Sequence, residues 1–176
     1  MSPGRIVLYR GLMPGAFGLD VHGGYGEAWS WEFEYAKGFA HPPHGFILKA
    51  VLHPSAKRLV LVTAVDADGF SKCVPDGIRL LAEIVGDPWV YDSVMSGHEA
   101  LWEVWEPEWT KAVIDAGYDS IFTGGFDAPE EYVLNANKLQ FVRYYRIPAR
   151  DCVEGYPIEA DTLEQLGYVV GLVTAV

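Results

Sequence analysis

The chain has 176 residues, of which 50% are hydrophobic and 14% aromatic, and its formal net charge is −11. This length suits a single domain over residues 1–176 with a buried core, and the composition excludes generic disorder. No segment approaches the roughly 18 to 20 consecutive apolar residues of a membrane span, and the N-terminus lacks a signal-peptide pattern. We therefore expect a cytoplasmic protein with no membrane partner and with reduced cysteines at Cys73 and Cys152.

The acidity is concentrated in one segment. Residues 76–135 carry two basic and thirteen acidic side chains, whereas residues 1–75 and 136–176 have balances of +1 and −1. Binding to nucleic acid or anionic membrane needs a basic face, so the charge disfavours both. It is compatible with a basic partner surface, or with solubility alone.

The N-terminal half predicts strands with one short helix between them. Arg5 to Arg10 is strand-like and is stopped by Gly11 and Pro14. Ser30 is a candidate N-cap for a helix that ends before the His41–Gly45 loop. Branched apolar residues predict further strands at 46–53 and 58–64.

The C-terminal half predicts both helices and strands. Helices are expected at 78–85 and at 107–116, where Gly117 is a helix stop, whereas 87–107 has no clear assignment. The remaining predictions are strands at 119–123, 131–134 and 139–147, a tail helix from Asp161 and a strand at 169–176. The fold class is therefore α+β.

Three patterns follow one another in a distinctive order. Arg10 closes the first strand, and Ser30 precedes a segment ending in Ala36-Lys37-Gly38-Phe39-Ala40. The third pattern is Asp115-Ala116-Gly117-Tyr118-Asp119-Ser120-Ile121, followed by Glu130-Glu131-Tyr132-Val133-Leu134-Asn135. Together they resemble the mono-ADP-ribosyltransferase family, in the Arg-Ser-Glu class of bacterial toxins and phage enzymes. The resemblance covers residues 6–53 and 108–146 and leaves an acidic, aromatic insertion at about 65–107 unassigned.

The resemblance implies a fold, a substrate and a catalytic set. The fold is a split β-sandwich of two roughly perpendicular antiparallel sheets with flanking helices, and the substrate is NAD. Arg10, beside Gly11, would hold the NAD phosphates, for which a guanidinium offers a planar fork of donors. Glu131 would stabilise the oxocarbenium-like ribosyl cation, and Ser30 would orient the site.

Further residues receive roles from the same resemblance. Tyr25, Trp29 and Phe39 are candidates for the aromatic wall of a nicotinamide pocket. Phe126, Asp127 and Glu130 would belong to a target-recognition loop.

Departures from the family pattern leave the acceptor open. Pro129 stands two positions before Glu131, where side-chain-specific members carry an acceptor-activating residue. The charge favours a protein acceptor over a nucleic acid, although a nucleic-acid acceptor stays an open alternative. NAD hydrolysis with water as acceptor is the alternative within enzymes, and a non-catalytic acidic protein that binds a basic partner is the alternative outside them.

Simpler interpretations accompany each candidate. Arg10 alone reads as a surface arginine, and Ser30 as a helix cap. Glu130 and Glu131 are adjacent on a strand, so they point to opposite faces and do not form a paired-carboxylate site. His41 and His44 with a distant cysteine are weak evidence for a metal, and no metal site is expected.

Overall fold

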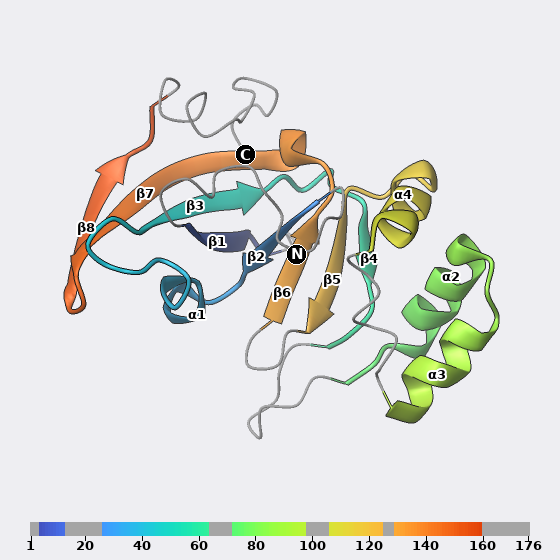
Figure 1. The fold of residues 1–176 in the computed structure, drawn as a ribbon. Coiled ribbons are helices and arrows are strands. Elements are labelled where there is room, and N and C mark those ends of the chain that lie inside the picture. Colours follow the sequence, from blue (N-terminus) through green and yellow to red (C-terminus); the bar gives the residue numbers. More distant parts are fainter. Residues whose placement is uncertain (1–3, 13–25, 64–71, 98–105, 125–128, 160–176) are drawn as a thin grey trace. The chain divides into compact units, whose positions relative to one another are not determined.

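A computed structural model describes residues 4–12, 26–63, 72–97, 106–124 and 129–159 of the chain. Its secondary structure is mixed α+β, which confirms the predicted class (Figure 1). The chain divides into two compact units. The first comprises Met1–Leu19, Trp29–Ala56 and Asn135–Val176, and the second comprises Asp20–Ala28 and Lys57–Leu134.

The first unit is an antiparallel sheet built from strands near both ends of the sequence. The strand order is β2-β1-β3-β7-β8, and each pairing with a described register is antiparallel. The division between the units falls inside β2, after Ala28. The strands are β1 (Ile6–Leu12), β2 (Glu27–Ser30), β3 (Phe46–Leu52), β7 (Leu139–Ala149) and β8 (Cys152–Pro157), and the 3₁₀ turn η2 (Ala136–Lys138) precedes β7.

The short helix α1 (Phe33–Lys37) packs on one face of this sheet. Phe33 contacts Tyr9 of β1 and Tyr145 of β7 edge to face, with ring centroids 5.5 and 5.1 Å apart. A helix of five residues is not stable alone, so these tertiary contacts hold it in place. The buried cluster between the helix segment and the sheet consists of Ala36, Ala40, Ile47 and Ile147.

The opposite face of the sheet is also apolar. Leu8, Leu48 and Ala50 are completely buried, as is Trp29, whose ring meets Phe141 edge to face at 5.9 Å. Burial on both faces explains why these strands read as continuous apolar runs and not as alternating ones.

In the described residues of the second unit, from Lys57 onward, three strands and three helices are found. Strand β4 (Arg58–Val60) is parallel to β5 (Ser120–Gly124), which is antiparallel to β6 (Pro129–Val133). The parallel pair departs from the expected antiparallel sheets. The long connection between β4 and β5 makes this pairing possible, since parallel neighbours need a crossover of this kind.

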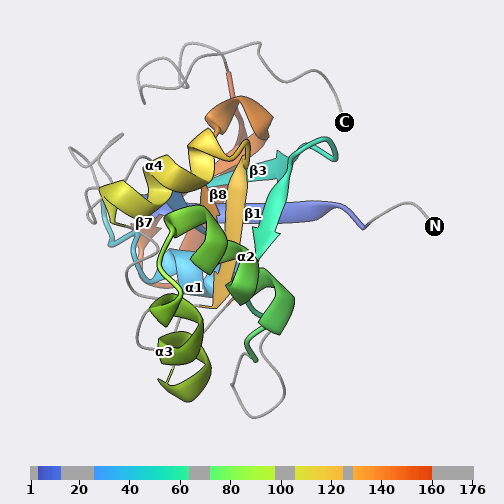
Figure 2. The ribbon, with the colours of Figure 1, turned by 90° about the vertical axis from the view of Figure 1, so that its right-hand side faces the viewer.

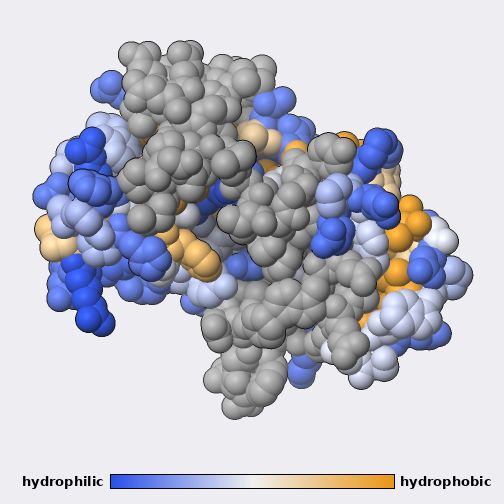
Figure 3. Space-filling view, viewed as in Figure 1, coloured by the Kyte–Doolittle hydropathy of each residue, from blue (hydrophilic) through white to orange (hydrophobic). Residues whose placement is uncertain are grey.

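That connection contains the helices α2 (Pro75–Val85), α3 (Trp89–Gly97) and α4 (Pro107–Asp115), which Figure 2 views from their own side. At Gly77 of α2 an added Cβ would lie 1.9 Å from the carbonyl oxygen of Val60, so the helix starts directly against β4. Figure 3 shows an apolar patch over the helices of this unit. Among their side chains that remain partly exposed are Leu80, Ile84 and Val85.

The prediction that Ser30 opens a helix is wrong. Ser30 ends β2, and α1 begins at Phe33 with Glu32 at its N-cap position. The backbone N–H of Glu32 donates to Ser30 Oγ at 3.0 Å. The serine hydroxyl therefore stabilises the turn between strand and helix, a role that local serine hydrogen bonds commonly fill.

The other predicted helices and strands agree with the structure in part. The helix at 107–116 is confirmed as α4, and Gly117 follows it with φ +88°, a conformation that favours glycine. Helix α3 lies in the segment without assignment, and β8 was not predicted because its exposed residues carry no apolar alternation. The expected strand at 58–64 is shorter, and β1 continues through Gly11 to Leu12. The tail predicted from Asp161 onward lies outside the described residues.

Candidate functional site

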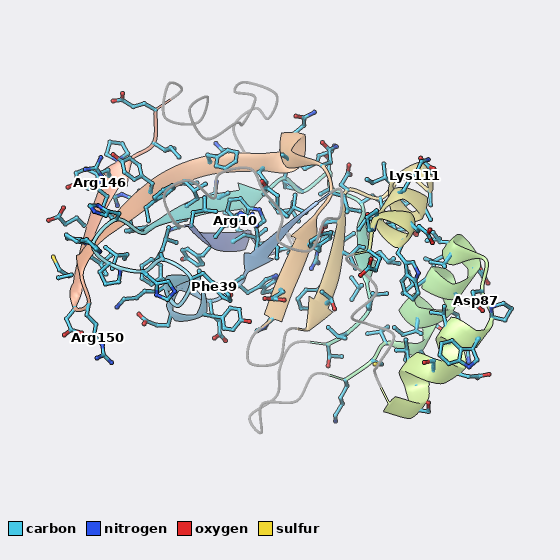
Figure 4. All side chains as sticks on the ribbon, in the orientation of Figure 1. Arg10, Phe39, Asp87, Lys111, Arg146 and Arg150 are labelled. Carbon is cyan, nitrogen blue, oxygen red and sulfur yellow. The ribbon has the colours of Figure 1, made fainter. Side chains whose placement is uncertain are left out.

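Arg10 and Ser30 lie on neighbouring strands of the first unit. Arg10 is half-buried on β1 and stands opposite Leu48 of β3, as Figure 4 shows for its place in the sheet. On the other side of β1, Ser30 pairs with Tyr9. Ser30 is 5% exposed and closes β2. Ser30 therefore lies opposite the residue that directly precedes Arg10 on β1.

The register also determines which faces the two side chains occupy. Directly paired residues share a face, and successive residues alternate. Ser30 therefore shares the face of Tyr9, on which α1 packs, whereas Arg10 shares the face of Leu48. The side chains of Arg10 and Ser30 leave opposite faces of the sheet, and alternation does not bring them together.

Gly11 lies directly under α1. A Cβ at Gly11 would be 1.9 Å from the carbonyl oxygen of Ala36 and 3.1 Å from Cβ of Phe39. The residue after Arg10 must lack a side chain because the backbone of the helix approaches this closely. This packing explains Gly11 without any ligand, and its predicted part in NAD binding stays a prediction.

The aromatic candidates differ in accessibility. Trp29 is 0% exposed and packs within the unit, so its ring is not presented to a ligand. Phe39, by contrast, is 54% exposed just beyond α1 and meets Tyr35 edge to face at 5.4 Å (Figure 4). Tyr25, the third candidate, lies outside the described residues.

Glu131 of the second unit is completely buried and ion-paired. Arg58 donates from Nε to Oε1 at 2.7 Å and from Nη2 to Oε2 at 2.9 Å. Ser120 Oγ donates to Oε1 at 2.7 Å. The guanidinium also lies over the ring of Phe122, 5.3 Å from its centroid. A two-pronged pair of this kind is among the strongest charge-assisted contacts in proteins.

Glu130 points the other way. It is 9% exposed and stands opposite Thr123 of β5, which is 2% exposed. Because β6 is regular through both glutamates, Glu130 projects to the face opposite Arg58 and Ser120. The expected division of the two acids between opposite faces is confirmed.

The predicted residues thus fall into separate groups. Arg10, Gly11, Ser30, Trp29 and Phe39 belong to the first unit, and Glu130 and Glu131 belong to the second. Phe126 and Asp127 lie outside the described residues. Within the part of the chain that the structure describes, no three His, Cys, Asp or Glu side chains gather in a way that could hold a metal ion.

The contacts of Arg58 were not predicted from the sequence. Arg58 is separated from Glu131 by 73 positions, and only the placement of β4 and β6 on either side of β5 brings them together. Ser120 belongs to the third sequence pattern but received no role there. The contact between Ser120 and Glu131 joins two neighbouring strands, so no local sequence pattern indicates it.

Two side chains elsewhere have altered pKa values. Burial raises the pKa of the Cys73 thiol, since a thiolate is poorly solvated there. The hydroxyl of Tyr156 donates to Oε2 of Glu154 at 2.7 Å, and this hydrogen bond raises the pKa of Tyr156.

Comparison with models of protein families, with curated proteins and with solved structures gave no match to this chain. The likeness to the mono-ADP-ribosyltransferases therefore stays a prediction from the residues quoted above. Among the described helices, none is both long and apolar enough to cross a membrane.

Proposed function

We propose that the chain is an NAD-dependent mono-ADP-ribosyltransferase of the toxin or phage effector type, acting in the cytoplasm on a macromolecular acceptor. A protein is the favoured acceptor because of the acidic charge. The observation that carries the proposal is the order of the three sequence patterns, in which Arg10 lies on β1, Ser30 closes β2 and Glu131 lies on β6.

The proposed reaction breaks the bond between nicotinamide and C1′ of the adjacent ribose. The bonding electron pair leaves with nicotinamide, an acceptor atom bonds to C1′, and the acceptor proton is released. Arg10 binds the phosphates, Ser30 orients the dinucleotide, and Glu131 stabilises the cationic ribose in the transition state.

A split β-sandwich of two roughly perpendicular antiparallel sheets belongs to the same proposal. The antiparallel pairings of the first unit support it. The parallel pairing of β4 with β5 is a departure from that plan.

The test measures nicotinamide release from NAD by the purified chain. Replacement of Arg10 by alanine should weaken NAD binding and raise KM, because the phosphates lose their guanidinium partner. Arg150→Ala is the matched control, since Arg150 is exposed in the same unit at the end of β7 (Figure 4). A wild-type chain that releases no nicotinamide overturns the proposal, as does an Arg10 variant with unchanged KM and kcat.

Labelled NAD added to cell extract separates transfer from hydrolysis. A labelled macromolecule indicates transfer, whereas free ADP-ribose alone indicates an NAD glycohydrolase. The position of Pro129 two residues before Glu131 is the observation that favours hydrolysis.

A non-catalytic role in binding a basic partner is a second candidate. It is favoured by exposed acidic side chains on and beside the helices of the second unit, which include Asp76, Glu83, Asp87, Asp92, Glu106, Glu108 and Asp115. Such binding should weaken with salt and on neutralisation of Glu106 and Glu108, and should survive Arg10→Ala.

A further inference from the structure

Two consecutive helices of the second unit, α2 and α3, present apolar side chains to solvent. Leu80 and Ile84 are one turn apart on α2 and are partly exposed, as is Val85 at the end of that helix. Helix α3 begins with Trp89, which at 64% is the most exposed large hydrophobic side chain among the described residues, and Met95 of the same helix is 38% exposed. These five side chains are called the α2–α3 surface below.

The fold of the second unit does not depend on this surface. Each helix has a separate inner face, which is buried and consists of Ile78, Leu81 and Ala82 on α2 and of Val90 and Val94 on α3. The side chains of the α2–α3 surface lie outside these inner faces, within the region where Figure 3 shows an apolar patch. Grouped apolar side chains that a folded chain leaves exposed commonly mark an interaction site.

The charges next to this surface are acidic. The segment 75–97 carries one basic side chain, Arg79, and four acidic ones. Arg79 is paired with Asp76 at 3.3 Å. Within the described residues, no lysine or arginine forms an ion pair with the other three acids, which are exposed and are Glu83, Asp87 and Asp92. Asp92 lies between Trp89 and Met95 along α3, at helical spacing from both, so a negative charge separates two apolar contacts.

We propose that the α2–α3 surface docks a segment of a partner protein in which apolar side chains are interspersed with lysine or arginine. The apolar side chains of the partner cover Trp89 and its neighbours, and its cations pair with Glu83, Asp87 and Asp92. A large exposed aromatic side chain is the usual anchor of such a contact, and charges around it set the choice of partner. Like charge opposes docking of nucleic acid, and it opposes two copies of this surface facing each other.

This inference goes beyond the proposed activity. It concerns residues of the second unit alone, and it applies whether or not the chain turns over NAD. It also adds an apolar contact and its location to the acidic binding considered above.

The experiment measures the fluorescence anisotropy of a labelled synthetic peptide of leucine and lysine, patterned to form an amphipathic helix. A scrambled peptide has the same composition and charge but no apolar face, and it should bind the wild-type chain more weakly. Trp89→Ser should weaken binding of the patterned peptide by about tenfold or more, as loss of an aromatic anchor does, with an unchanged urea unfolding midpoint. Val142→Ser is the control, since Val142 is 43% exposed on β7 of the first unit, and it should leave binding unchanged.

A second pair of variants tests the charges. Neutralising Glu83, Asp87 and Asp92 together as amides should weaken binding and reduce its dependence on salt. The control neutralises three exposed acids of the first unit, Glu34, Asp151 and Glu159, and should have the smaller effect.

Several outcomes overturn the proposal. A scrambled peptide that binds as tightly as the patterned one shows that charge alone is recognised. Equal losses in Trp89→Ser and Val142→Ser place the contact elsewhere, as do equal losses in the two charge variants. Sedimentation that shows self-association of the wild-type chain, abolished in Trp89→Ser, assigns the surface to a second copy instead.

Discussion

The guanidinium of Arg58 and the carboxylate of Glu131 join β4 to β6 across the intervening strand β5, with donor–acceptor distances of 2.7 and 2.9 Å. Glu131 is completely buried, whereas the side chain of Arg58 is 23% exposed. The guanidinium of Arg58 also lies over the ring of Phe122, 5.3 Å from its centroid.

This pair should dominate the electrostatic contribution to the stability of the second unit. Arg58→Met leaves Glu131 buried without its cation, and we expect the free energy of unfolding to fall by about 3 kcal/mol in urea denaturation. Arg79→Met is the control, because its contacts with Asp76 and Tyr91 are exposed and should together contribute about 1 kcal/mol. Equal losses in the two variants would contradict the importance of the buried pair.

The close approach of α1 to β1 makes Gly11 intolerant of a side chain. Gly11→Ala would place Cβ 1.9 Å from the carbonyl oxygen of Ala36, so the helix has to move. We expect a loss of about 1 to 3 kcal/mol in unfolding free energy, typical of overpacking. Gly4→Ala is the control, since a Cβ there meets nothing within 4 Å. Wild-type stability of Gly11→Ala would show that the helix does not pack this closely.

The hydroxyl of Ser30 stabilises the turn between β2 and α1. Ser30→Ala removes the acceptor for the N–H of Glu32, and the expected cost in thermal or urea unfolding is about 1 kcal/mol. Ser96→Ala removes an exposed hydroxyl whose contact is to Ser93 in the same helix, and it should change stability by only a few tenths of a kcal/mol. If the Ser30 and Ser96 variants are equally stable, the hydroxyl of Ser30 has no structural role.

The two cysteines should react with iodoacetamide at different rates. The thiolate is the reactive form, and burial raises the pKa of Cys73, so less thiolate is present at any pH below that pKa. Cys152 is exposed. Mass spectrometry at neutral pH should find Cys152 modified first, and modification of Cys73 should accelerate as the pH rises past the ordinary thiol value of about 8.5. Cys152→Ser and Cys73→Ser assign the two rates, and faster labelling of Cys73 at neutral pH would refute the expectation.

Local sequence signals predicted several elements correctly. Pro107 begins α4 and Gly117 follows its end, because proline tolerates the first helical turn and glycine accepts a positive φ. Ser30 shows the limit of such signals. A serine near acidic residues is compatible with a helix cap, but pairing with β1 keeps its backbone extended and moves the helix start to Phe33.

The sequence by itself determined the α+β class, the terminal residues of α4 and the opposite directions of Glu130 and Glu131, because these depend on short-range patterns and on strand periodicity. It also supplied the resemblance on which the proposed activity rests. Only the tertiary structure decided that both glutamates are buried and which group pairs with Glu131, because Arg58 lies 73 positions away on another strand. The burial of a side chain depends on strands that come together from distant parts of the chain, and a local sequence pattern does not indicate it.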